Sequence, residues 1–132
     1  MPAAETYPDD LLYHPEHDWA RITDGEAVFG ITWFAQDSLG QLVHLEPPEE
    51  GLTVSKDQPY TEVESVKAVS DVIAPLSGVV IEVNRAVGEA PETVNDDPYG
   101  EGWLVRVRLS DPGEADSLMD AAAYQRHLAE QG

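Results

Sequence analysis

Cysteine is absent from the chain of 132 residues, so the sequence excludes disulfides, thiolate metal ligands and cysteine nucleophiles together. Basic residues are also scarce: seven lysines and arginines stand against 26 aspartates and glutamates, for a formal net charge of −19. Such a charge repels phosphate backbones, so we expect no nucleic-acid partner. No apolar run approaches the roughly 20 residues that span a bilayer, so we expect no membrane partner either.

The first ten residues, MPAAETYPDD, contain acids and no cation. A secretory signal needs a basic start and an apolar core, and a transit peptide is rich in arginine. The segment matches neither pattern, so we expect a cytoplasmic protein of a prokaryote. A chain of this length is the size of one domain with one core, and we predict a single domain over residues 1–132.

Short strand patterns dominate the first 110 residues. The segments HDWARIT and EAVFGIT flank Asp24 and Gly25, a pair that suits the positive φ angles of a tight hairpin turn. Further runs rich in β-branched residues follow between closely spaced turns, at YTEVESV, AVSDVIA, GVVIEVN and WLVRVRL. This spacing predicts a mainly β fold, a flattened barrel or a sandwich, rather than a parallel sheet with crossover helices.

Two segments have a helical pattern instead. WFAQDSLG, residues 33–40, predicts one or two helical turns that end at Gly40. A C-terminal segment over about 112–130 follows a predicted cap at Ser110 or Asp111, has a second predicted cap at Asp120, and repeats apolar residues at helical spacing. We expect this segment to pack on the sheet and to contribute to the core.

The position of Lys67 is the feature that composition does not explain. The chain has two lysines, Lys56 and Lys67, and Lys67 lies midway along TEVESVKAVSDVIAP. Both halves of that stretch have strand patterns, so we predict a hairpin over residues 61–74 with Lys67 at its tip. This hairpin contains no Gly, Pro or Asn to supply ordinary turn chemistry. A protruding amine suits covalent modification, and an exposed turn lysine without a function is the alternative.

Other candidate sites carry weaker signals. His14 and His17 have a spacing that can hold zinc on a helix, but a proline lies between them and no cysteine completes the set, so we predict no metal site. Ser65 and Ser70 lie near Lys67, but a lysine at a solvated tip lacks the burial that activates a catalytic lysine. We therefore expect no Ser–Lys nucleophile, and no catalytic residue in the chain.

The stretch ESVKAVSD, residues 64–71, resembles the lipoyl-attachment motif of the glycine cleavage system H protein family. The resemblance covers about residues 13–128, through HPEHDWARI, GITWFAQDSLG, VIAPLSGVVIEVN, VNDDPYGEGWLVRVRLSDP and AAAYQRHLAE. It implies the flattened barrel or sandwich of the lipoyl-domain type (a barrel-sandwich hybrid), with lipoate in amide linkage on Lys67. Biotin-carrying domains have methionines beside their lysine, whereas this chain has Val66 and Ala68, which favours lipoate.

The function that the resemblance implies is that of a carrier. It would shuttle the aminomethyl group of glycine from glycine decarboxylase (P protein) to aminomethyltransferase (T protein), and electrons to dihydrolipoyl dehydrogenase (L protein). The resemblance also implies Glu64 as a recognition residue for lipoyl-attaching enzymes. We assign four residues to a cleft that shelters the arm: Ser65, Asp71, Glu16 and Trp33. The alternatives are a related lipoyl carrier for lipoyl relay or another redox pathway, and an unmodified acidic interaction module.

Overall fold

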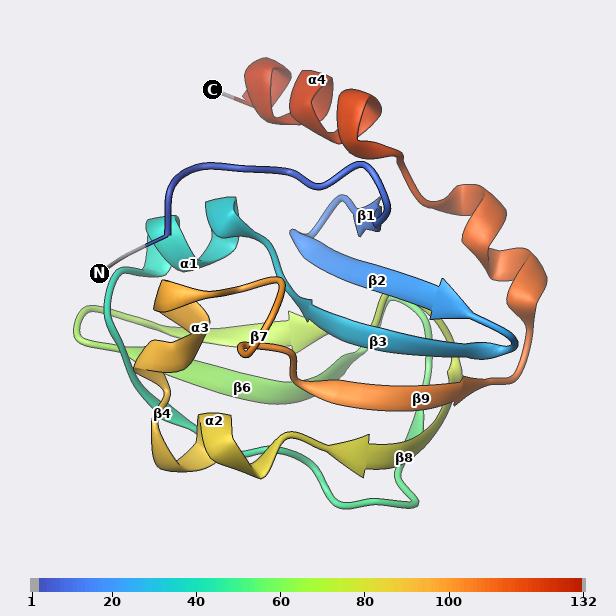
Figure 1. Ribbon diagram of the computed structural model, residues 1–132, viewed down its shortest axis with the longest axis horizontal. Coiled ribbons are helices and arrows are strands. Elements are labelled where there is room, and N and C mark those ends of the chain that lie inside the picture. The colour runs from blue at the N-terminus through green and yellow to red at the C-terminus, as the bar shows by residue number, and fades with distance from the viewer. Residues whose placement is uncertain (1–2, 132) are drawn as a thin grey trace.

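Two antiparallel β-sheets make up most of the molecule in a computed structural model that describes residues 3–131 (Figure 1). The larger sheet has six strands in the order β1-β2-β3-β9-β8-β5, and the smaller sheet has three in the order β4-β6-β7. The strands are β1 (Leu12–His14), β2 (Asp18–Thr23), β3 (Glu26–Ile31), β4 (Leu42–Leu45), β5 (Thr53–Val54), β6 (Pro59–Ser65), β7 (Val69–Ile73), β8 (Gly78–Val83) and β9 (Val105–Leu109).

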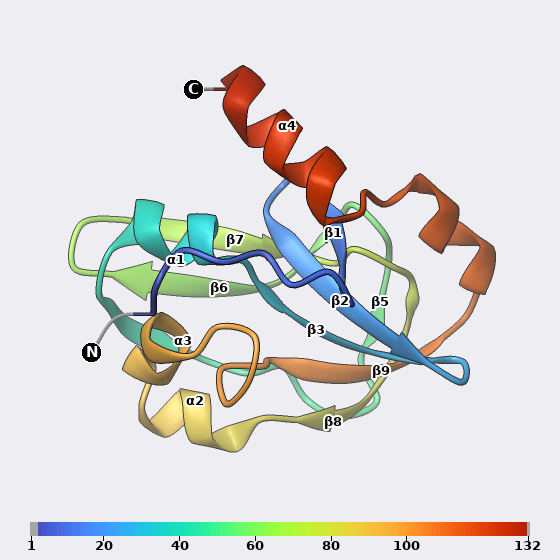
Figure 2. The ribbon, with the colours of Figure 1, turned by 45° about the horizontal axis from the view of Figure 1, so that its top comes forward.

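Three short helices lie at one end of the sheets: α1 (Trp33–Leu39), α2 (Arg85–Glu89) and α3 (Glu92–Asp96) (Figures 1 and 2). The 3₁₀ helix η1 (Pro112–Ser117) lies at the opposite end, and the longer α4 (Ala121–Gln131) lies across β1. The predicted end of α1 is confirmed, because the Gly40 N–H donates to the Gln36 carbonyl at 2.9 Å. The sequence did not predict α2. Within residues 3–131, no helix has the length and apolar character needed to cross a membrane.

The hairpin of β2 and β3 forms where the sequence predicted it. Asp24 and Gly25 adopt φ angles of 50° and 80°, the left-handed pair that a two-residue turn requires. In β3, Ala27 and Phe29 are buried, and Val28 between them is partly exposed, as expected for a strand with one face on the core. Local sequence is therefore enough to fix this hairpin and its register.

The main core lies between the two sheets. Buried side chains of β3, β8 and β9 from the larger sheet share one cluster with those of β4, β6 and β7 from the smaller sheet. Among residues 3–131 no strand pairing joins the sheets, so they do not close into a barrel. The mainly β prediction, with short helices and a C-terminal helix, is confirmed, and the sandwich is the form that the chain adopts.

A second, aromatic cluster holds the C-terminal segment on β1. Tyr13 of β1 stacks on Tyr124 of α4, with ring centroids 4.8 Å apart and ring planes 7° apart. Both predicted caps are confirmed: Asp111 accepts a hydrogen bond from the Gly113 N–H at 3.1 Å, and Asp120 accepts one from the Ala123 N–H at 2.8 Å. The C-terminal segment therefore contributes to the core, as expected.

Gly30 lies opposite the fully buried Trp19 in the β2–β3 ladder, and a Cβ atom on Gly30 would lie 2.5 Å from two carbon atoms of the indole. We expect Gly30→Ala to lower the free energy of unfolding by about 1–3 kcal/mol, because the packed indole has no room to move. In a Trp19→Phe background the same change should cost less, since phenylalanine lacks the indole atoms that clash. Urea unfolding of the four proteins tests this, and an equal cost in both backgrounds would contradict it.

Candidate functional site

The hairpin of β6 and β7 carries Lys67 at its tip. The two strands pair in antiparallel register down to Glu64 and Val69, and residues 66–68 connect them. Lys67 is exposed, and its neighbours Val66 and Val69 are 68% and 60% exposed. The tip therefore presents one amine among small side chains that leave it open to approach.

The buried Ser65 builds the turn at this tip. Its Oγ accepts hydrogen bonds from the backbone N–H groups of Lys67 and Ala68, at 3.3 and 3.1 Å, and its own N–H donates to the Ala68 carbonyl at 2.8 Å. A serine hydroxyl that binds the backbone two and three residues ahead replaces the Gly, Pro or Asn of ordinary turns. Ser65 was predicted to line a cleft, and in the structure its hydroxyl binds the backbone of the turn.

A neighbouring loop supports the tip from the side. The Val66 N–H donates to the carbonyl of Gln41, between α1 and β4, at 3.1 Å. Gly40 lies beside the lysine stem, because a Cβ atom there would be 3.7 Å from Lys67 Cε. Both ribbon views show this loop alongside the end of the hairpin (Figures 1 and 2). The backbone at the root of the Lys67 side chain is thus held from within the turn and from outside it.

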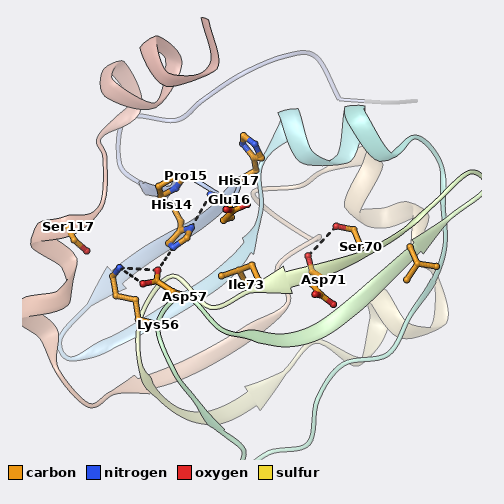
Figure 3. Close-up of a pocket in the computed structure, with 11 residues that line it drawn as sticks. His14, Pro15, Glu16, His17, Lys56, Asp57, Ser70, Asp71, Ile73 and Ser117 are labelled. Atoms are coloured by element: carbon orange, nitrogen blue, oxygen red, sulfur yellow. Dashed lines mark hydrogen bonds and ion pairs between the residues drawn. The ribbon is translucent and has the colours of Figure 1, made fainter. Parts of the chain in front are cut away.

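A groove of about 840 Å³ runs beside β7, on the side away from β6 (Figure 3). Glu16 and Asp71 both line it, so the structure brings together two of the residues predicted for a cleft. A smaller hollow of about 170 Å³ adjoins it and shares Glu16, His17, Ser70 and Asp71 with it. The two hollows together form an acidic surface beside β7, the strand that follows Lys67.

Asp18 lines the smaller hollow, although nothing in the sequence had marked it as a site residue. Its carboxyl is buried and accepts a hydrogen bond from the backbone of Ile73, but its Oδ2 atom has no partner among the described residues. Burial raises the pKa of Asp18 well above its ordinary value, and the nearby charge of Glu16 raises it further. Asp18 is therefore a buried acid behind the hollow, in a site that favours the uncharged form of its carboxyl.

His14 and His17 have separate structural roles. The Glu16 N–H donates to His14 Nδ1 at 3.0 Å, so the neutral ring carries its proton on Nε2 and donates it to Asp57 Oδ1 at 2.6 Å (Figure 3). His17 Nδ1 is 2.8 Å from the Tyr124 hydroxyl, and burial lowers the His17 pKa. In residues 3–131, no group of three or more His, Asp or Glu side chains is arranged to hold a metal ion.

The two lysines differ in their surroundings. Lys56 Nζ forms an ion pair with Asp57 Oδ1 at 3.1 Å, and the hydrogen bond from His14, followed by that from Lys56, lowers the pKa of Asp57. Lys67 Nζ makes no ion pair or hydrogen bond with any residue in the described part of the chain. Lys67 is therefore the lysine whose amine is available for chemistry.

The remaining two predicted residues lie outside the groove. Trp33 donates from its indole Nε1 to the Ala3 carbonyl at 2.8 Å and packs against the aromatic cluster, apart from the residues that line the groove. Glu64 is exposed on β6 and lies opposite Val69 on one side and His44 on the other. Glu64 is thus close to the tip and accessible to another protein.

The paired sheets and the hairpin that carries a lysine define a β-sandwich of the lipoyl-domain class. Residues 11–131 match the family model described as "Glycine cleavage H-protein". The chain therefore belongs to the glycine cleavage H-protein family.

Individual relatives agree along nearly the whole chain. Two proteins named "Glycine cleavage system H protein", from Halorhodospira halophila and Symbiobacterium thermophilum, are 51% and 49% identical, over 95% and 93% of this chain and 97% and 96% of theirs. A crystal structure of such a protein from Mycobacterium marinum matches with a TM-score of 0.86 and 41% identity, and the match covers 92% of this chain and 98% of that one.

The burial of Asp18 predicts a pH dependence of stability. Its pKa is raised in the folded state, so its stabilising contribution is complete below the unfolded value near 3.8 and is lost as the pH rises through the folded pKa. The free energy of unfolding of the wild type, minus that of Asp18→Asn, should fall as the pH rises from about 4, by at most about 1.4 kcal/mol per pH unit. Urea unfolding at several pH values measures this difference, and a constant difference would contradict the prediction.

Proposed function

We propose that the chain is the lipoyl-bearing carrier of a glycine cleavage system and has no catalytic centre of its own. The observation that carries the proposal is the exposed amine of Lys67, free of ion pairs within residues 3–131, on a hairpin tip held by Ser65 and Gln41. Family membership and the names of the relatives support the same role. We further propose that its partners are the P, T and L proteins.

The residues present fit a lipoyl group in amide linkage on Lys67. An acylating enzyme needs an amine that it can reach, and Val66, Ala68 and Val69 around Lys67 are all exposed. The group, once attached, supplies a disulfide that can be reduced and reoxidised and that carries the aminomethyl fragment of glycine between active sites. The demanding chemistry then belongs to the cofactors of partner enzymes.

The hairpin contributes position rather than reactivity. Its strands fix the backbone at Lys67, while the exposed lysine side chain remains free to turn. A tether on a fixed root raises the effective concentration of its far end at each site within reach. We propose that Glu64, on the strand that leads to the tip, is recognised by the lipoyl-attaching enzymes.

The groove contributes shelter and charge. Glu16 and Asp71 line both adjoining hollows, and an amine cargo is positively charged at neutral pH. We propose that these acids retain the loaded arm and limit its contact with water.

Attachment at Lys67 is tested by intact mass. Native protein should carry the mass of one lipoyl group on a peptide that contains Lys67, and Lys67→Arg should lose that mass entirely because a guanidinium cannot be acylated in this way. Lys56→Arg, the matched control, should retain the full mass, since Lys56 is paired with Asp57. A bare wild-type protein from a cell with active lipoylation would identify an unmodified interaction module instead.

Retention of the cargo is tested with Asp71→Asn. We expect the loaded protein to release ammonia about two to five times faster without T protein when one carboxylate is removed from the groove, in line with about 1 kcal/mol for a partly solvated charge contact. Asp37→Asn is the control, because Asp37 is an exposed acid of α1 that lines a different hollow. Equal release from both variants and the wild type would rule out this role for Asp71.

A further inference from the structure

The side chain of Asn95, in α3, makes three hydrogen bonds that all reach the α1–β4 region. Its amide nitrogen donates to Gln36 Oε1 and to the Gly40 carbonyl, both at 2.9 Å, and its Oδ1 accepts from the Leu42 N–H at 2.9 Å. Both donors of the amide group are therefore in use. Asn95 ties α3 to the last turn of α1 and to the first residue of β4.

Asn95 binds the Gly40 carbonyl and the Leu42 N–H, which lie on either side of Gln41, the residue that supports the hairpin tip. Gln41 lies between Gly40 and Leu42, and its carbonyl accepts the hydrogen bond from the Val66 N–H at 3.1 Å. Val66 is the residue before Lys67. A short path of hydrogen bonds thus leads from Asn95, through the loop of residues 40–42, to the backbone at the root of the lysine.

We propose that Asn95 is a positioning residue for the acylation of Lys67, acting through the 40–42 loop on the hairpin tip. This inference rests on the proposed function. Without the Asn95 side chain, the loop loses the hydrogen bonds at the Gly40 carbonyl and the Leu42 N–H, and Gln41 no longer offers a fixed acceptor to Val66. The tip would then spend only part of its time in the arrangement that the attaching enzyme binds.

Partial population of the competent tip predicts a specific kinetic signature. The apparent affinity of the attaching enzyme for the carrier is the intrinsic affinity multiplied by the fraction of carrier molecules whose tip has the competent arrangement. The chemical step after binding is unchanged. We expect Asn95→Ala to raise the KM for the carrier about tenfold and to leave kcat close to the wild-type value. Hydrogen exchange of the Val66 amide should accelerate in the same variant, because its acceptor is no longer fixed.

Asn84 provides a matched control. Its side chain also makes three hydrogen bonds, donating to the carbonyls of Glu101 and Trp103 at 2.8 and 2.7 Å and accepting from the Ala86 N–H at 3.2 Å. None of these bonds reaches the 40–42 loop or the hairpin. Asn84→Ala should therefore lower the melting temperature without changing the KM for acylation or the exchange of the Val66 amide.

A second variant disturbs the same loop without touching Asn95. Gly40 has a φ angle of 83°, so Gly40→Ala strains the loop beside Val66 even though its Cβ atom would have room. We expect Gly40→Ala to raise KM in the same way as Asn95→Ala. Gly51→Ala is its control, because Gly51 has a φ angle of 93° and nothing within 4 Å of the added atom.

The experiment measures acylation of the unmodified full-length carrier by a lipoyl-attaching enzyme with ATP and lipoate, together with hydrogen exchange of the same proteins. A higher KM and faster Val66 exchange in Asn95→Ala and Gly40→Ala, but not in their controls, support the inference. Wild-type values in these two variants would overturn the inference and leave the proposed function intact. A wild-type protein that is not acylated at Lys67 would overturn both.

Discussion

The hydrogen bond between the Val66 N–H and the Gln41 carbonyl is the interaction on which the site depends. A two-stranded hairpin is marginally stable alone, and its tip has the fewest neighbours. Here the turn is closed from inside by Ser65 and held from outside by the loop after α1. The consequence is a fixed backbone at Lys67 beneath a free side chain, which is what a tethered carrier requires.

The rest of the fold positions an acidic groove beside that hairpin. The aromatic cluster holds α4 on β1, and the His14–Asp57 hydrogen bond links β1 to the turn before β6. These contacts support the wall of the groove to which Glu16 belongs. The buried carboxyl of Asp18, behind the smaller hollow, costs stability as it ionises.

Local features were predictable from the sequence, and long-range ones were not. The turn at Asp24 and Gly25 and the helix ends at Gly40 and Asp120 follow from residues close together in the chain, and the structure has them. The contact between the Asp18 carboxyl and the backbone of Ile73 joins segments more than fifty residues apart, and no local pattern encodes it. Helix α2 was missed because the residue that caps it, Asn84, directly follows a strand.

Residue roles around the hairpin were harder to assign than its position. The alternation of strand residues was enough to locate the tip, but the absence of ordinary turn residues gave no sign that Ser65 replaces them. Trp33 stands in a motif shared with the family, yet its indole points to Ala3 and the aromatic cluster. A motif identifies which residues are close in sequence to a site, and side-chain direction decides which of them reach it.

The central claim, a fixed backbone beneath a free amine, is tested most directly by NMR relaxation of the unmodified protein. We predict backbone order parameters of about 0.85 for residues 65–68, like those of β6 and β7, together with fast motion at Lys67 Nζ. Order parameters below about 0.6 along the tip would contradict it, because the lysine would then have no fixed root.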